Sequence, residues 1–255
     1  MLIHTLSQGE SMRIQTFLKT HKTLSYATLA AACVLAAMLA AGFPHARARS
    51  VQAQSLPLLG MEFAIDAGHG GFDAGAPGVH ANVKEAPLNL AISRYLRQEL
   101  ALRGATVTMT RTNDLALGQT KKEDMRRRHD VLSNHPYTAV ISIHLNTHPN
   151  SGGARVFCQE ADTPSYGLAR CVLAELNKLL SRTPLVPSIA NHYVLRGIQS
   201  PGILVECGFI SNPEEEALLQ QKDFQRRVAC AIADGLEAYF APHAQFEEDW
   251  AEMPG

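Results

Sequence analysis

The chain lacks the cysteine spacing that would identify a structural zinc site. None of its five cysteines stands in a CxxC pair, which excludes a zinc ribbon. One cysteine lies in an apolar stretch near the N-terminus, and we expect the other four to be buried as small hydrophobic side chains rather than joined in disulfides. These four are Cys158, Cys171, Cys207 and Cys230.

The chain also lacks an excess of charge of one sign. Its formal net charge is −1 at pH 7, whereas binding to nucleic-acid phosphates needs a concentrated basic face. We therefore expect no nucleic-acid partner. The strongest basic run, Arg126 to Arg128, is typical of the solvated face of a helix.

Nucleotide-binding motifs are missing as well. Gly68 and Gly70 begin a GxG pattern, but Asp73 stands where the third glycine would be, and the chain has no GxxxxGK. The glycines on either side of His69 indicate instead tight turns and a close approach of the backbone.

A long apolar run is present near the N-terminus. Leu24 to Phe43 follows several basic residues and precedes the small-residue pattern Ala46-Arg47-Ala48. A run of about 20 residues can span a bilayer, whereas the apolar core of a cleaved signal has about 7 to 15 residues. Length favours a membrane anchor and the small residues fit signal cleavage, so both interpretations stay open. Both place the following domain outside the cytoplasm.

The chain is therefore expected to have five parts. They are a cytoplasmic segment (1–23), an anchor or signal peptide (24–43), a linker (44–60), one folded domain (61–243) and an acidic, flexible tail (244–255). Within the folded domain, strand-like and helix-like patterns alternate, which predicts an α/β layered domain. Strands are expected at 62–67, 106–111, 138–143, 154–158, 193–195 and after 201, and helices at 87–103, 121–133, 164–180, from 213, and at 224–240.

Three short apolar runs of the domain lead to residues that can bind a metal or move a proton. FAID leads to His69, VISI to His144 and ILV to Glu206. Chemistry in open α/β sheets collects at the carboxyl ends of the strands, so these residues are expected to meet. The pattern predicts a metal-centred hydrolytic site.

Each candidate also has a structural interpretation. A single histidine at a strand end is more often a hydrogen-bonded structural residue or a surface residue than a metal ligand. Glu85 precedes Pro87 at the start of a predicted helix, where the helix dipole alone favours a carboxylate. Glu206 lies within GILVECGF, where an unpaired charge is costly. Backbone donors could satisfy its carboxylate, or it could face a metal-bound water.

Four segments, in order along residues 61–240, carry a family resemblance. FAIDAGHGGFDAGAPG, KEAPLNLAISRYL, SIHLN and LVECGFISNPEEE resemble the zinc-dependent N-acetylmuramoyl-L-alanine amidases of the type 3 family. The resemblance implies a single domain with a twisted, mostly parallel or mixed sheet and helices on both faces. It also implies one Zn²⁺ held by His69, Glu85 and His144, with Glu206 as the catalytic residue. Arg128 matches an arginine upstream of the SIH strand, with a substrate-binding or structural role.

The resemblance further implies an activity and a substrate. The activity is hydrolysis of the amide between the lactyl group of N-acetylmuramic acid and L-alanine, and the substrate is peptidoglycan with its stem peptides. Ala67 and Ala86 stand where many relatives have Pro and Lys, and neither change removes a ligand. The link from His144 to Phe157 is too short for the helix-bearing insertion that blocks zinc in some relatives, so an open site is expected.

The compact form most resembles the sporulation-specific amidases that act on spore cortex. The sequence has no recognisable wall-binding repeat, so targeting would come from membrane attachment, from the cleft itself or from an activator or targeting protein. The other interpretations are a catalytically silent peptidoglycan-binding module, a zinc peptidase acting on another exported substrate, and a membrane scaffold.

Overall fold

The computed structural model describes residues 56–80, 82–148, 150–180 and 186–251. The chain divides into two units, Met1–Gln54 and Ser55–Gly255, and the first lies outside the described residues. The predicted anchor or signal peptide at Leu24 to Phe43 therefore lies outside them too. Among the helices that are described, none has both the length and the apolar character needed to cross a membrane.

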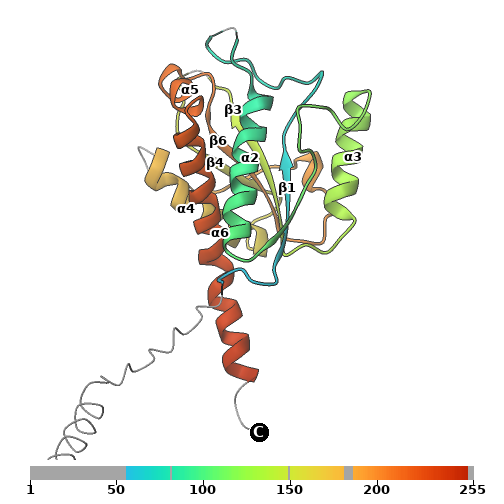
Figure 1. Ribbon diagram of the computed structural model, residues 1–255, viewed down its shortest axis with the longest axis vertical. Coiled ribbons are helices and arrows are strands. Elements are labelled where there is room, and N and C mark those ends of the chain that lie inside the picture. Colours follow the sequence, from blue (N-terminus) through green and yellow to red (C-terminus); the bar gives the residue numbers. More distant parts are fainter. Residues whose placement is uncertain (1–55, 81, 149, 181–185, 252–255) are drawn as a thin grey trace, which may run out of the picture. The chain divides into compact units, whose positions relative to one another are not determined.

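The second unit is a single α/β domain built on a six-stranded sheet (Figure 1). Its strands are β1 (Glu62–Ala67), β2 (Thr106–Met109), β3 (Ala139–Asn146), β4 (Arg155–Cys158), β5 (Ser188–Ile189) and β6 (Gly202–Phe209). Its helices are α2 (Glu85–Leu102), α3 (Lys121–Ser133), α4 (Pro164–Leu180), η1 (Tyr193–Leu195), α5 (Pro213–Leu219) and α6 (Lys222–Ala251).

The sheet is mixed but mostly parallel, with the strand order β2-β1-β3-β6-β4-β5. The pairs of β1 with β2, β1 with β3, and β3 with β6 are parallel, whereas β4 runs antiparallel to β6. The carboxyl ends of β1, β3 and β6 therefore meet at one edge, as the sequence predicted.

Helices cover both faces of the sheet, which confirms the predicted architecture. α2, α4 and α6 lie side by side (Figure 1) and pack against one face through a large apolar cluster that includes Phe63 and Ile141. α3 and η1 cover the opposite face through a smaller cluster that includes Ala64 and Val140. Neighbouring residues of a strand contribute to different clusters because successive side chains point to opposite faces.

Three helix ends follow from local chemistry. α2 begins two residues before Pro87, which is tolerated because the first-turn amides have no acceptor within the helix. The chain leaves this helix through Gly104, at φ +92°, a conformation that glycine adopts without strain. The Thr120 side chain caps α3 by accepting from the Glu123 amide at 3.2 Å.

Two predicted elements are wrong. Residues 193–195 form the 3₁₀ turn η1 rather than a strand, because the amides of Leu195 and Arg196 bond back to the carbonyls of His192 and Tyr193. Val194 and Leu195 of this turn are buried in the smaller apolar cluster, whereas the Tyr193 side chain is exposed. In addition, α6 continues to Ala251, beyond the helix end predicted at 240.

The α4–α6 contact generates a stability prediction. A Cβ added to Gly235 of α6 would lie 2.5 Å from Val172 Cα, a backbone atom of α4, whereas a Cβ added to Gly167 would meet the movable ring of Tyr239 at 3.1 Å. Gly235→Ala should destabilise the domain by about 1–3 kcal/mol through overpacking, despite a gain of about 1 kcal/mol in helix propensity. Gly167→Ala is the control and should be neutral or stabilising. Urea unfolding of the two variants measures the difference, and equal midpoints would contradict this packing.

Candidate metal centre

His69 stands in a loop that the sequence shapes closely. β1 ends at Ala67, and His69 adopts a left-handed backbone conformation with φ +61°. A Cβ on Gly68 would lie 2.3 Å from the His144 ring, so only glycine lets this imidazole approach the loop. The predicted close approach of the backbone around His69 is confirmed.

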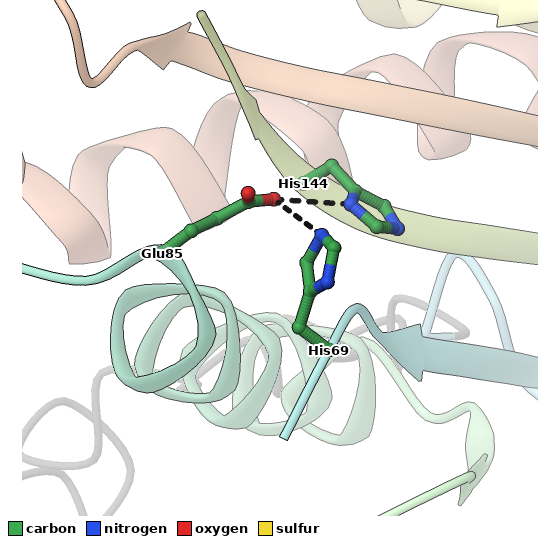
Figure 2. Close-up of side chains that lie close together, drawn as sticks. All are labelled: His69, Glu85 and His144. Atoms are coloured by element: carbon green, nitrogen blue, oxygen red, sulfur yellow. Dashed lines mark hydrogen bonds and ion pairs between the residues drawn. The ribbon is translucent and has the colours of Figure 1, made fainter. Parts of the chain in front are cut away.

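Glu85 and His144 complete a group of three side chains (Figure 2). Glu85 is the first residue of α2, and His144 lies near the end of β3. Oε1 of Glu85 lies 3.3 Å from Nε2 of His69 and 3.1 Å from Nδ1 of His144. One potential ligand atom from each residue lies within 4.8 Å of the others. The structure therefore brings together the three residues that the sequence proposed as metal ligands.

The Glu85 carboxylate is buried and held in its ionised form. Three protein donors reach it, namely the amides of Ala76 and Leu145 at 2.8 and 3.0 Å and the side chain of Asn89 at 3.0 Å. Burial by itself raises the pKa of Glu85, but hydrogen bonds and positive charge from His144 and His69 outweigh burial and hold it well below its usual range. An ionised carboxylate is the form that binds a cation.

A second carboxylate lies beside the outer nitrogen of the His69 ring. Oδ2 of Asp73 lies 3.0 Å from Nδ1 of His69, so Nε2 faces Glu85. Burial lowers the pKa of His69, and contacts with Glu85 and Asp73 more than reverse this effect. Histidine ligands are commonly oriented by a carboxylate at their other nitrogen, and Asp73 stands at that position.

Two buried arginines hold the loop that carries His69. Arg128 donates to the carbonyls of Ala67 and His69, and Arg111 donates to the carbonyls of Ala67 and Gly68 at 2.8 and 2.9 Å. Burial and the neighbouring charge of Arg128 lower the pKa of Arg111 to about 10. Guanidinium groups thus hold three consecutive carbonyls of this loop, up to and including that of His69.

Arg128 corrects one sequence interpretation. Arg126 and Arg127 lie on the exposed face of α3, as predicted for this basic run, but Arg128 is only 1% exposed. Its guanidinium also binds Asp66 at 2.8 Å and Asp124 at 2.7 Å. The helical period turns this third arginine inward, where these acceptors compensate its charge.

Glu206 occupies the next strand. It is in register with His144 across the β3–β6 pair, and its Oε2 is buried without a hydrogen-bond partner among the described residues. Burial raises the pKa of Glu206 to about 7, against the opposing positive charge of His144. A carboxyl group with a pKa near neutrality is suited to accepting and returning a proton.

The donor set fits a catalytic zinc ion. Two imidazoles and one carboxylate are ligands that such sites use, with a further position left for water or substrate. A cavity of about 200 Å³ adjoins the two histidines and continues between α3 and η1. Lys121 and Met125 line it from α3, and Tyr193 lines it from η1.

Several of these residues are not predicted from the sequence. Asp73 stands there only where a third glycine would be, although its position four residues after His69 is a signal for a contact with that ring. Arg111 closes a predicted strand, and a charge at a strand end is the same signal that identified His144. Lys121 and Tyr193 had no local signal, because only the packing of α3 beside η1 brings them to one cavity.

Comparison with known proteins identifies the class. The sequence pattern of the family described as N-acetylmuramoyl-L-alanine amidase, Amidase_3, matches residues 63–238. The chain belongs to this family, and it is a hydrolase with N-acetylmuramoyl-L-alanine amidase activity on peptidoglycan. As a cell-wall amidase, it acts outside the cytoplasm.

Particular relatives are similar over most of the domain. A germination-specific N-acetylmuramoyl-L-alanine amidase of Bacillus subtilis (strain 168) is 34% identical over 197 residues, which are 73% of this chain and 82% of the relative. The CwlD amidase of Clostridioides difficile, solved in complex with the GerS lipoprotein, is 31% identical with a TM-score of 0.66 over 70% of this chain and 98% of that one. The catalytic domain of CwlV from Bacillus (Paenibacillus) polymyxa var. colistinus is 30% identical with a TM-score of 0.61, over 70% and 97% of the two chains.

The buried ion pairs of Arg128 generate a prediction. Arg128→Met should destabilise the domain by about 3–5 kcal/mol, because it leaves two buried carboxylates without their partner. Arg126→Met, which removes only an exposed pair with Asp130, should change stability by less than about 0.5 kcal/mol. Urea unfolding measures both, and an Arg128 variant as stable as the Arg126 variant would refute the inward role.

The pKa of Glu206 predicts a pH dependence in metal-free protein. The folded state holds the proton of Glu206 up to a pKa of about 7, against 4.5 for the ordinary group. Its contribution to stability is therefore complete below pH 4.5 and is lost as the pH rises toward 7. Glu206→Gln should gain stability relative to wild type between pH 5 and 8. The control is Glu160→Gln, at an exposed residue. The free energy of unfolding of each variant is measured at pH 5 and at pH 8, and an equal change in both variants would contradict the effect of burial on Glu206.

Proposed function

We propose that His69, Glu85 and His144 hold one Zn²⁺ and that Glu206 is the catalytic acid and base. The proposed reaction is hydrolysis of the amide between the lactyl group of N-acetylmuramic acid and L-alanine. The observation that carries the proposal is the buried Oε2 of Glu206, without a partner among the described residues and one strand away from His144. An isolated carboxylate is costly to bury, and proton transfer beside a cation would account for its position.

The chemistry divides between the ion and the chain. When bound, zinc supplies a Lewis acid for the amide carbonyl and lowers the pKa of water. Glu206 accepts the proton of the attacking water and then returns it to the L-alanine nitrogen, so that the stem peptide leaves as a free amine. Asp73 and the two buried arginines keep His69 in place during these steps.

The biological setting is proposed from the relatives. Similarity to a germination-specific amidase supports action on spore-cortex or other cell-wall peptidoglycan during sporulation. We further propose that the apolar run at Leu24 to Phe43 delivers the domain beyond the cytoplasm, either as a membrane anchor or as a cleaved signal. The segment suits both.

The connection after His144 supports an open centre. β3 ends at Asn146 and β4 begins at Arg155, and the described residues between them form no helix. We propose that no internal plug covers the metal centre. The C. difficile amidase was solved in complex with a lipoprotein, which supports a protein partner here as well, acting by targeting or activation.

Exchange of the proton-transfer group should separate metal binding from catalysis. Glu206→Gln should keep zinc but lower the rate of amide cleavage by about 10²–10⁴-fold, whereas His69→Ala should lose both zinc and activity. The measurements are zinc content and mass spectrometry of muropeptides from purified peptidoglycan, with and without a chelator. Stem-peptide release at the wild-type rate by the Glu206 variant would refute its role. Products other than free N-terminal L-alanine would refute the proposed reaction.

A further inference from the structure

Lys121 stands at the lip of the cavity beside the metal centre. It is the first residue of α3, and it lines the same cavity as His69, His144 and Tyr193. Its ammonium lies 3.2 Å from Oδ2 of Asp73, and the side chain is 69% exposed. An ammonium has three donors, so this contact with Asp73 leaves Lys121 able to bind a further acceptor.

The other charged groups along this cavity are already paired with one another. Arg128 is buried and bound to Asp66 and Asp124, and these carboxylates line the cavity too. Asp73 is shared between His69 and Lys121. Among the described residues that line the cavity, Lys121 is therefore the cation that a ligand can reach from solvent.

The position of Lys121 in its helix has an electrostatic cost. The N-terminus of a helix carries a partial positive charge, which favours anions and disfavours cations. The lysine and the helix start therefore add their positive potentials at the cavity lip. Glu123 and Asp124, the acidic residues of the first turn, are bound to Arg127 and Arg128, which limits how far they cancel this potential.

We propose that Lys121 binds a carboxylate of the stem peptide, carried by the residue that follows L-alanine. The inference rests on the proposed function and assigns the α3 side of the cavity to the peptide part of the substrate. Lys121 Nζ lies 3.2 Å from Oδ2 of Asp73, and the same oxygen lies 3.0 Å from Nδ1 of His69, so the ammonium is at most about 8 Å from Nε2, the ring nitrogen that faces Glu85. A carboxylate one residue beyond L-alanine lies up to about 7 Å from the scissile nitrogen, which is compatible with a contact to Lys121 when that nitrogen is at the metal centre.

The chemistry of stem peptides offers a direct test. Two glycan-strand substrates are needed that differ only at the second stem residue, with either a free α-carboxylate or a carboxamide. The full chain loaded with zinc should prefer the carboxylate substrate by about fivefold in kcat/KM, the size expected for one exposed charged contact. The preference should shrink when salt is raised from 0.05 to about 0.5 M, because screening weakens exposed charge pairs.

Variants of two adjacent lysines then isolate the contact. Lys121→Met should bring the ratio of the two kcat/KM values to about one, and Lys121→Arg should preserve the preference. Lys122→Met is the matched control, since it removes the same charge from the same helical turn at a residue that does not line the cavity. It should keep the wild-type ratio.

The outcomes are distinguishable. Two results would overturn the inference and leave the amidase proposal standing. The first is wild type that cleaves both substrates equally, and the second is a Lys121→Met variant that loses activity on both substrates while keeping its preference. The second result would mean that Lys121 acts only by holding Asp73 against His69. Wild type that cleaves neither substrate would instead overturn the proposed function.

Discussion

The candidate centre depends on one negative charge, the carboxylate of Glu85, held between two imidazoles at the start of a helix. Its Oε1 reaches His69 and His144, while amides from the preceding loop and from β3 bind the carboxylate. Three separate elements therefore have a common acceptor. Removing a carboxylate from water is costly unless such partners replace the solvent, so α2, the loop and β3 must all be in place before the charge is stable. The same requirement sets the spacing of the three candidate ligands.

The buried polar groups next to the centre hold the loop that carries His69 and take no part in the proposed chemistry. Arg128 and Arg111 share the Ala67 carbonyl, and they also bind the carbonyls of the next two residues. Burial raises the pKa of Asp66, but the charge of Arg128, with further hydrogen bonds, holds it below its usual range. Buried ion pairs contribute little net stability compared with apolar packing. Their value here is positional, because a ligand loop fixed by several directional bonds keeps its histidine at one place.

The sequence predicted the parts of the centre that follow from strand ends and failed where tertiary contact decides. His69, His144 and Glu206 could be found because each follows a buried apolar run, and parallel strands bring such ends to one edge. Arg128 looked like part of an exposed run, since only the docking of α3 on the sheet reveals which side of the helix is buried. Likewise, η1 carries strand-forming residues but closes into a turn under local hydrogen bonds. Propensity is a weak guide for three residues.

At the ends of β3 and β6, one face of the sheet contributes to the large apolar cluster and the other face presents the side chains of the candidate centre. In β3 and β6, Ile143 and Val205 enter the large apolar cluster under α2, α4 and α6. Their neighbours His144 and Glu206 point the other way, because side chains alternate along a strand. Each strand can thus contribute to the core with one set of residues and to the centre with the next. This coupling also protects the site, since a register slip of one residue would bury His144 and Glu206 in the core and expose the apolar set. The burial that drives folding therefore selects the register in which these two side chains meet.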